Sequence, residues 1–202
     1  RYFETIPGAA ASVCYPFGYG LSYTTFALSD VRGGMNGAGE IALSATVTNT
    51  GLCAGKYVLQ AYVNPPKGRI AKPATALVGF AKTRLLEPNE SETLTVSFAP
   101  YAFATYDDEG AVRKSAYVLE KGAYGFRVGE NVRETVNVDY RYELDDDAIL
   151  EQLSPKCAPT LLHRRMLADG SYREIACAPE TPREDWRKLE GIPDEGQYPL
   201  EN

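Results

Sequence analysis

Hydrophobic side chains recur at every second position between residues 21 and 140, which is the spacing of β-strands with one buried face. In the clearest run, small or hydroxyl residues alternate with Ile41, Leu43, Ala45 and Val47. Further runs occupy 57–63, 94–98, 124–128 and 136–140. In the first of these, Gln60 and Tyr62 are expected on the solvent face. Since no helical periodicity occurs before residue 145, an all-β fold with antiparallel sheets is predicted.

Turn-forming residues separate these runs every ten to twenty residues or so. The turns are expected at 33–39, 49–51, 65–68, 87–90 and 107–110. About seven short strands joined in this way predict a β-sandwich of about 120 residues. Trp186, the single tryptophan, lies outside the sandwich, so the Cys–Trp–Cys core of antibody domains is absent. A fibronectin III-like sandwich without a disulfide is therefore expected.

The formal net charge of −6 is confined to one part of the chain. Residues 1–140 contain 13 acidic and 13 basic residues, whereas residues 141–202 contain 14 and 8. This asymmetry predicts a boundary near residue 140. Three segments are expected: an N-terminal segment at 1–20, the sandwich at 21–140, and an acidic, proline-containing extension or linker at 141–202.

The extension is expected to be irregular and partly helical. Three aspartates at 145–147 precede the apolar residues of 148–153, and Pro155 follows. This order is typical of a short helix with an N-cap and acidic residues at its positive end. A further helical turn is expected at Glu184–Leu189, while six prolines between 155 and 199 favour a linker over an independent fold.

Composition excludes several function classes. The chain has no basic stripe, which argues against nucleic acid as a partner, and no run of about 18 apolar residues that would span a membrane. His163 is the single histidine, and the four cysteines are widely spaced, so neither a metal site nor any other cofactor is predicted. Isolated thiols favour a reducing compartment such as the cytoplasm over an oxidising one in which disulfides form. Secretion stays open, because a chain that begins with Arg1 is expected to be a piece of a longer one.

The densest motif spans residues 15–26 and begins with the aromatic loop, residues 15–20. Pro16 stiffens it, and Gly18 and Gly20 allow sharp turns, which leaves Tyr15, Phe17 and Tyr19 as large planar side chains on a constrained backbone. These three aromatic residues are the candidate substrate-binding residues, at the rim of a sugar site. The alternative is a packing seam between domains. The seam is favoured, because the loop precedes the sandwich and must also dock on it.

The motif also carries a family resemblance. Residues 15–26 read Y-P-F-G-Y-G-L-S-Y-T-T-F and resemble F-P-F-G-x-G-L-S-Y-T-x-F, the segment that joins the second domain of family 3 glycoside hydrolases to their fibronectin III-like domain. Segments similar to the same family follow in order at 47–55, 60–63, 77–82 and 120–129, and residues 1–5 resemble the stretch that precedes the loop. The resemblance implies that residues 1–20 include the end of a preceding α/β domain.

Family 3 enzymes are retaining β-glycosidases, many of them β-glucosidases, with an Asp nucleophile on a barrel domain and a Glu acid/base usually on the α/β domain. This chemistry needs two carboxylates about 5 Å apart, and neither family motif for them occurs here. Asp107, Asp108 and Glu109 are expected to be solvated in a polar turn. No catalytic residue is therefore assigned. The resemblance implies a non-catalytic accessory domain whose partners are the catalytic domains of the same parent chain.

The connector of a subgroup with reversed domain order resembles residues 151–154 and 157–159, so the extension is expected to lead into the barrel. The competing interpretation is the ordinary domain order with an extended C-terminal arm.

The alternative function is a module that binds carbohydrate or a surface partner. Its candidate aromatic residues are Tyr62, Tyr101, Phe103 and Tyr106, provided that they line up on one face. A small basic cluster, Lys67, Arg69 and Lys72, is expected to be solvated, with anionic polysaccharide as a minor alternative.

Overall fold

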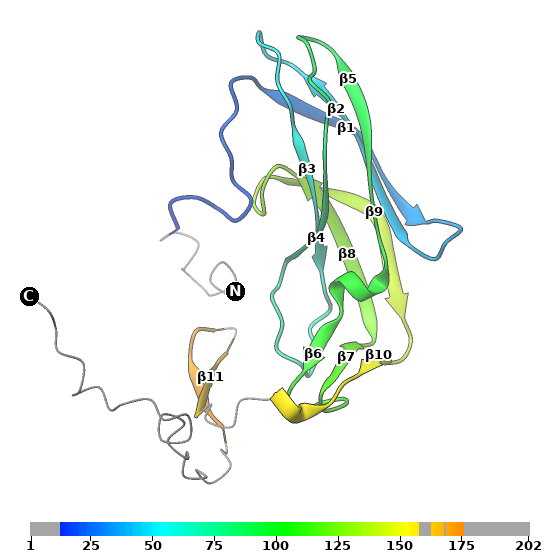
Figure 1. Cartoon of the computed structure of the whole chain (residues 1–202), viewed down its shortest axis with the longest axis vertical. Helices are drawn as coiled ribbons and strands as arrows, with labels where there is room; N and C mark the ends of the chain where they lie inside the picture. Colours follow the sequence, from blue (N-terminus) through cyan, green and yellow to red (C-terminus); the bar gives the residue numbers. More distant parts are fainter. Residues whose placement is uncertain (1–12, 158–162, 168, 176–202) are drawn as a thin grey trace, which may run out of the picture.

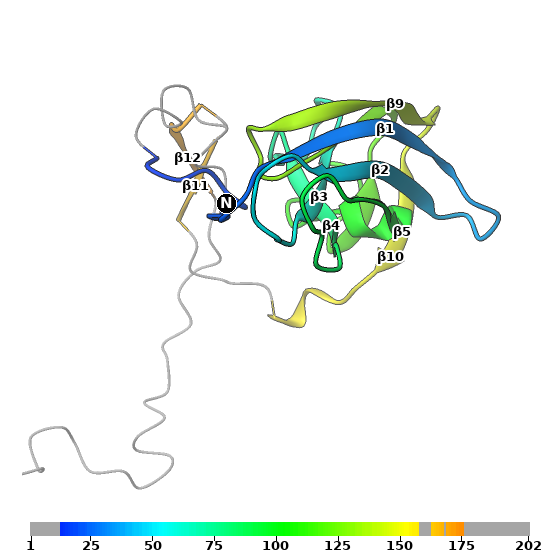
Figure 2. The same cartoon turned by 90° about the horizontal axis from the view of Figure 1, so that it is seen from above.

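The computed structural model describes residues 13–157, 163–167 and 169–175, and these form the predicted all-β sandwich. Two antiparallel sheets face each other (Figures 1 and 2). One sheet has the order β1-β2-β5, with β1 at Phe26–Met35, β2 at Ile41–Asn49 and β5 at Ser91–Phe98. The other has the order β4-β3-β8-β9, with β4 at Ala76–Lys82, β3 at Val58–Asn64, β8 at Gly122–Gly129 and β9 at Thr135–Leu144.

The core lies between these two sheets, and strand β2 shows how the sequence builds it. Its odd-numbered residues are fully buried, while the residues between them are half-buried on the outer face. On that outer face Thr46 and Thr93 share a hydrogen bond of 2.9 Å, and Thr48 and Ser91 share one of 2.8 Å. The alternation predicted for 41–47 is therefore confirmed.

Strand β3 departs from the prediction, because both of its faces are buried. Leu59, Ala61 and Val63 belong to the core, as expected. Gln60 and Tyr62 on the opposite face are 8% and 0% exposed, so their expected place in solvent is wrong. The physical reason is that Gly18 of the aromatic loop lies against both side chains, and its carbonyl accepts a hydrogen bond from Gln60.

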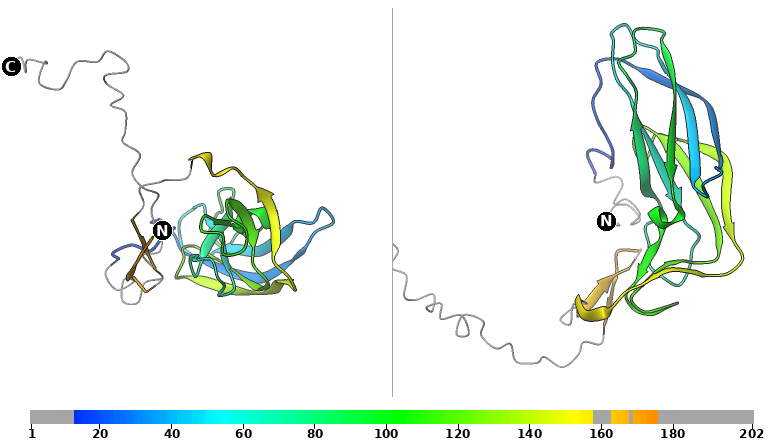
Figure 3. Two further views of the ribbon diagram at one scale, coloured as in Figure 1. Left: turned by 90° about the horizontal axis from the view of Figure 1, so that it is seen from below. Right: turned by 45° about the vertical axis from the view of Figure 1, so that its right-hand side comes forward.

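A third, smaller sheet closes one end of the sandwich. Its order is β10-β7-β6, with β10 at Ala148–Gln152, β7 at Ala116–Leu119 and β6 at Thr105–Asp107 (Figure 3). The helix predicted after the three aspartates is therefore wrong. Five residues are too few to offset the cost of helix nucleation, whereas the ladder to β7 satisfies their backbone directly. Asp147 does not cap a helix; it accepts a hydrogen bond of 2.9 Å from the Lys121 N–H.

Short elements complete the described chain. They are the 3-10 turns η2 at Pro100–Phe103 and η3 at Pro155–Cys157, and a hairpin of β11 at Arg164–Met166 and β12 at Tyr172–Glu174. Residues 13–25 and the hairpin lie on the same side of the sandwich (Figures 1 and 2). Across the described ranges no helix is long and apolar enough to span a bilayer. The helix predicted at Glu184–Leu189 lies outside the described residues.

Candidate docking site at the aromatic loop

The aromatic loop is held in a tight turn. The Tyr19 N–H donates to the Pro16 carbonyl at 3.0 Å, and Gly18 has a φ of +83°. A type II turn requires a positive φ at its third position, which glycine adopts without strain. A Cβ atom at this position would also lie against the Gln60 side chain. Gly18 is thus needed both for the turn and for the close approach of the loop to the sheet.

Hydrogen bonds fix this turn to the sandwich. The buried Gln60 amide donates from Nε2 to the Gly18 carbonyl at 2.9 Å and to the Glu130 carbonyl. Gln60 Oε1 in turn accepts from the Tyr62 hydroxyl at 2.5 Å. The Val132 N–H donates to the Phe17 carbonyl at 3.0 Å. Gln60 therefore joins the loop to the β8–β9 turn.

The aromatic side chains of the loop are largely exposed. Tyr15, Phe17 and Tyr19 are 67%, 59% and 44% exposed, and the rings of Tyr15 and Tyr19 contact each other with centroids 5.0 Å apart. Leu21 and Tyr23 continue the same alternation and are 90% and 100% exposed. Five large apolar side chains at alternate positions of one segment form an exposed surface of the kind that marks interaction sites.

A groove of about 1080 Å³ continues this surface. Its lining includes Tyr15 and Phe17 of the loop and residues of the edge strand β4 and of η2. Tyr62 and Lys72 also contribute to the lining. The sequence could not reveal this groove, because its walls come from segments far apart in the chain.

Lys72 belongs to a buried ion pair, so its predicted solvation is wrong. Its Nζ lies 2.5 Å from Oε2 of Glu120, and the two side chains are 7% and 4% exposed. Glu120 also accepts from the Arg69 N–H at 2.6 Å and the Ile70 N–H at 3.2 Å. Burial acts to raise the pKa of Glu120, but these hydrogen bonds outweigh it and hold the pKa below its ordinary value. Of the predicted basic cluster, Lys67 is exposed and the Arg69 guanidinium pairs with Asp147.

The predicted solvation of the acidic turn is wrong for Asp107, whereas Asp108 and Glu109 are exposed as expected. Asp107 is 1% exposed and accepts four backbone N–H bonds of 2.7–3.0 Å from residues 110–113. Burial raises its pKa, but the four N–H groups together bring the pKa below the ordinary value. Asp108 and Glu109 pair with Arg165, and Glu109 also pairs with Arg173 at 2.5 Å. The three carboxylates thus tie the turn and the hairpin together.

The aromatic candidates for a binding face divide into two groups. Tyr62 and Phe103 are 0% and 6% exposed and cannot stack on a ligand, so their assignment to such a face is wrong. Tyr101 and Tyr106 remain at the surface, and each contacts the ring of Tyr117, a residue that the sequence analysis missed. In the part of the chain that the structure describes, no group of three or more His, Cys, Asp or Glu could hold a metal ion.

We expect Gln60→Ala to release the aromatic loop from the sandwich. The Gly18 and Glu130 carbonyls lose their common donor, and the Tyr62 hydroxyl loses its acceptor. This should cost about 2 kcal/mol of unfolding free energy. Hydrogen exchange should accelerate at the N–H groups of Tyr19 and Val132. The matched control is Asn64→Ala, which removes an amide from the same strand that does not touch the loop. Equal acceleration in both variants would contradict the anchoring role.

Comparison with known proteins gives a consistent result. The family model of the fibronectin type III-like domain matches residues 57–132. Beta-glucosidase A of Butyrivibrio fibrisolvens is 49% identical over 87% of the chain and 23% of its own length. A beta-glucosidase of Ruminococcus albus is 38% identical over 98% of the chain and 21% of its own length.

A solved structure extends the similarity to the fold. The beta-glucosidase of Paenibacillus barengoltzii superposes with a TM-score of 0.74 at 38% identity, covering 96% of this chain and 22% of that one. The chain thus spans less than a quarter of the length of each of these three relatives.

Proposed function

We propose that the chain is the non-catalytic accessory domain of a family 3 β-glucosidase and buttresses the catalytic domains of that enzyme. The chain belongs to the fibronectin type III-like domains of these β-glucosidases. The observation that carries this proposal is the aromatic surface of residues 15–23. Its backbone is fixed to the sandwich, while its large apolar side chains are exposed. Such a surface gains stability when a neighbouring domain covers it.

The environment of the acidic turn supports a non-catalytic role. A retaining glycosidase needs a carboxylate that is open to attack the sugar and a second group that exchanges a proton. Both oxygens of Asp107 accept backbone N–H bonds, and Asp108 and Glu109 are engaged by arginines. These three residues are therefore unsuited to either role.

A chimeric enzyme tests the proposal. The chain replaces the matching segment of Butyrivibrio fibrisolvens β-glucosidase A, and the melting temperature and kcat/KM for an aryl β-glucoside are measured. We expect an active and stable chimera. The triple variant Tyr15→Ser, Phe17→Ser and Tyr19→Ser should lose on the order of 2–4 kcal/mol of domain contact. Leu52→Ser, at a position that is 94% exposed, is the control and should leave both quantities unchanged.

The outcomes separate the two interpretations of the aromatic loop. A lower melting temperature in the triple variant supports a seam between domains. An unchanged melting temperature with a raised KM would place the three residues at the rim of the sugar site. If neither the melting temperature nor KM changes, the proposal that the aromatic surface docks on a neighbouring domain is wrong. Turnover of the aryl glucoside by the isolated chain would overturn the non-catalytic role itself.

A further inference from the structure

The outer face of the small sheet carries a row of tyrosines. Tyr117 on the central strand β7 is directly opposite Tyr106 on β6 and Glu151 on β10. Direct partners in a ladder point to the same face. The flanking residues Ala116 and Val118 are buried, so Tyr117 faces outward.

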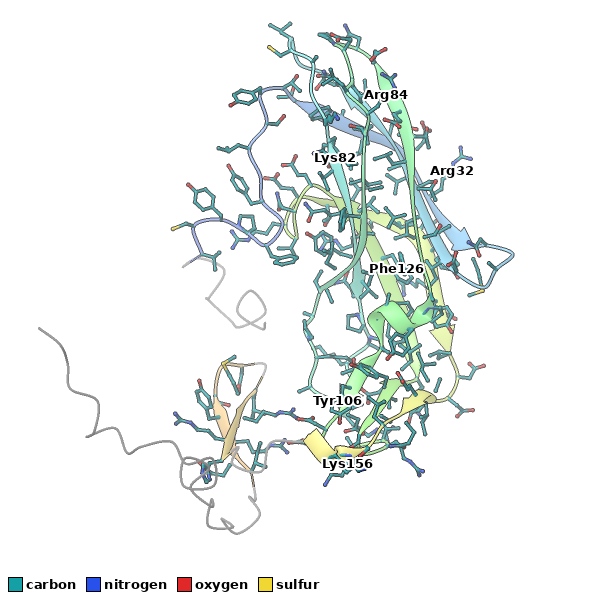
Figure 4. The ribbon with its side chains drawn as sticks, in the orientation of Figure 1. Arg32, Lys82, Arg84, Tyr106, Phe126 and Lys156 are labelled. Atoms are coloured by element: carbon teal, nitrogen blue, oxygen red, sulfur yellow. The ribbon has the colours of Figure 1, made fainter. Side chains whose placement is uncertain are left out.

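Tyr101 extends this row from η2. Its ring centroid lies 5.1 Å from that of Tyr117, and the centroid of Tyr106 lies 5.5 Å from Tyr117 on the other side. Tyr101 is 46% exposed, and Tyr106 and Tyr117 are half-buried. Three rings therefore lie in succession at the end of the sandwich where Figure 4 labels Tyr106.

A carboxylate completes the row. The Tyr101 hydroxyl donates to Oε2 of the exposed Glu151 at 2.5 Å. This hydrogen bond is the main reason that the pKa of Tyr101 is raised to about 12, so the phenol keeps its proton near neutral pH. Glu151 retains lone pairs that can accept further hydrogen bonds.

The geometry points to a carbohydrate-binding site on this tyrosine row, formed by Tyr101, Tyr106, Tyr117 and Glu151, that takes a neutral oligosaccharide. The C–H faces of a pyranose are apolar and stack on aromatic rings, while its rim of hydroxyls needs acceptors such as a carboxylate and donors such as a phenol. The planes of the Tyr101 and Tyr106 rings are tilted by 47° and 60° against that of Tyr117, so a sugar residue would stack on one ring at a time. The site is separate from the aromatic loop, so its test does not depend on the accessory role.

Titration of the chain with cellohexaose, followed by amide NMR shifts, tests the site. We expect shifts that saturate at millimolar sugar and map to β6, β7, β10 and η2. Tyr101→Ala should weaken the affinity about tenfold, the equivalent of about 1.4 kcal/mol. Glu151→Gln keeps an acceptor oxygen but loses the charge, and should weaken it less. Tyr172→Ala, at an exposed tyrosine of the hairpin, is the matched control and should bind as the unmodified chain does.

Several outcomes would overturn the proposal. They are an absence of shifts at millimolar sugar, shifts that map to residues 15–23, and an equal loss of affinity in Tyr172→Ala. Tyr101→Phe guards against misfolding, because it keeps the ring and should retain most of the affinity. If the chain binds no sugar and Tyr101→Ala lowers the melting temperature of the chimeric enzyme, the tyrosine row is a contact between domains instead.

Discussion

Replacing Asn49 with aspartate should destabilise the sandwich by about 3–4 kcal/mol. The Asn49 side chain is fully buried at the end of β2 and makes four hydrogen bonds. Its Nδ2 donates to the carbonyls of Cys53 at 2.8 Å and Leu86 at 2.9 Å. Its Oδ1 accepts from the Thr24 hydroxyl at 2.7 Å and the Gly51 N–H at 3.1 Å. An aspartate would leave two carbonyls without donors and place a negative charge beside them.

Urea unfolding measures this loss as a lower midpoint with an unchanged m value. The control is Asn64→Asp, the same substitution at a partly exposed asparagine of β3, which should cost well under half as much. Similar losses of unfolding free energy at both positions would contradict this role of Asn49, whose hydrogen bonds join Thr24 before β1 to Cys53 after β2 and Leu86 before β5. Since the Asn49→Asp variant can regain a donor by protonation of the new carboxylate, its difference from the unmodified chain should narrow in acid.

The second large effect is expected at the buried ion pair of Lys72 and Glu120. Glu120→Gln keeps the shape and an acceptor oxygen but leaves the Lys72 ammonium buried without its anion. Breaking a buried pair on one side costs about 3–5 kcal/mol. The double variant Lys72→Met, Glu120→Gln removes both charges and should recover most of that loss. A double variant as unstable as the single one would contradict this explanation.

An exposed pair provides the comparison, and pH provides a second readout. Nη1 of Arg84 lies 2.8 Å from Oε2 of Glu90, and both side chains are exposed. Because solvent screens such a pair, Glu90→Gln should change the unfolding midpoint very little. The folded pKa of Glu120 lies below the unfolded value of 4.5. Its stabilisation is therefore fully present above pH 4.5 and is lost as the pH falls through the lower folded pKa. The difference in unfolding free energy between Glu120→Gln and the unmodified chain should therefore shrink as the pH falls through that range.

Local periodicity was enough to predict the sandwich. Apolar and polar residues alternate along strand β2 because one face of its sheet is buried and the other is partly exposed, so neighbouring residues alone reveal the pattern. Asn49 and the aromatic loop could be picked out by their turn residues for the same reason. These features are signalled by residues close in sequence, even though Asn49 itself bonds to the distant Thr24 and Leu86.

The features that the sequence did not reveal depend on distant contacts. Gln60 and Tyr62 are polar or amphipathic, and the partners of Gln60 are Gly18, 42 residues earlier, and Glu130, 70 residues later. Lys72 meets Glu120 across 48 residues, and β10 forms because β7 offers it an open edge. Local propensity carries no information about such partners. The predictions of a solvated Lys72 and of a helix after the three aspartates failed for this reason.

The common side of the incoming segment and the outgoing hairpin has an evolutionary consequence. A unit whose chain enters and leaves on one side can be inserted into a host protein, or removed from it, without redirecting the flanking chain. The acidic turn strengthens this property, because its pairs with Arg165 and Arg173 hold the exit hairpin against the sandwich. The arrangement is therefore compatible with exchange of the sandwich between host proteins as one unit.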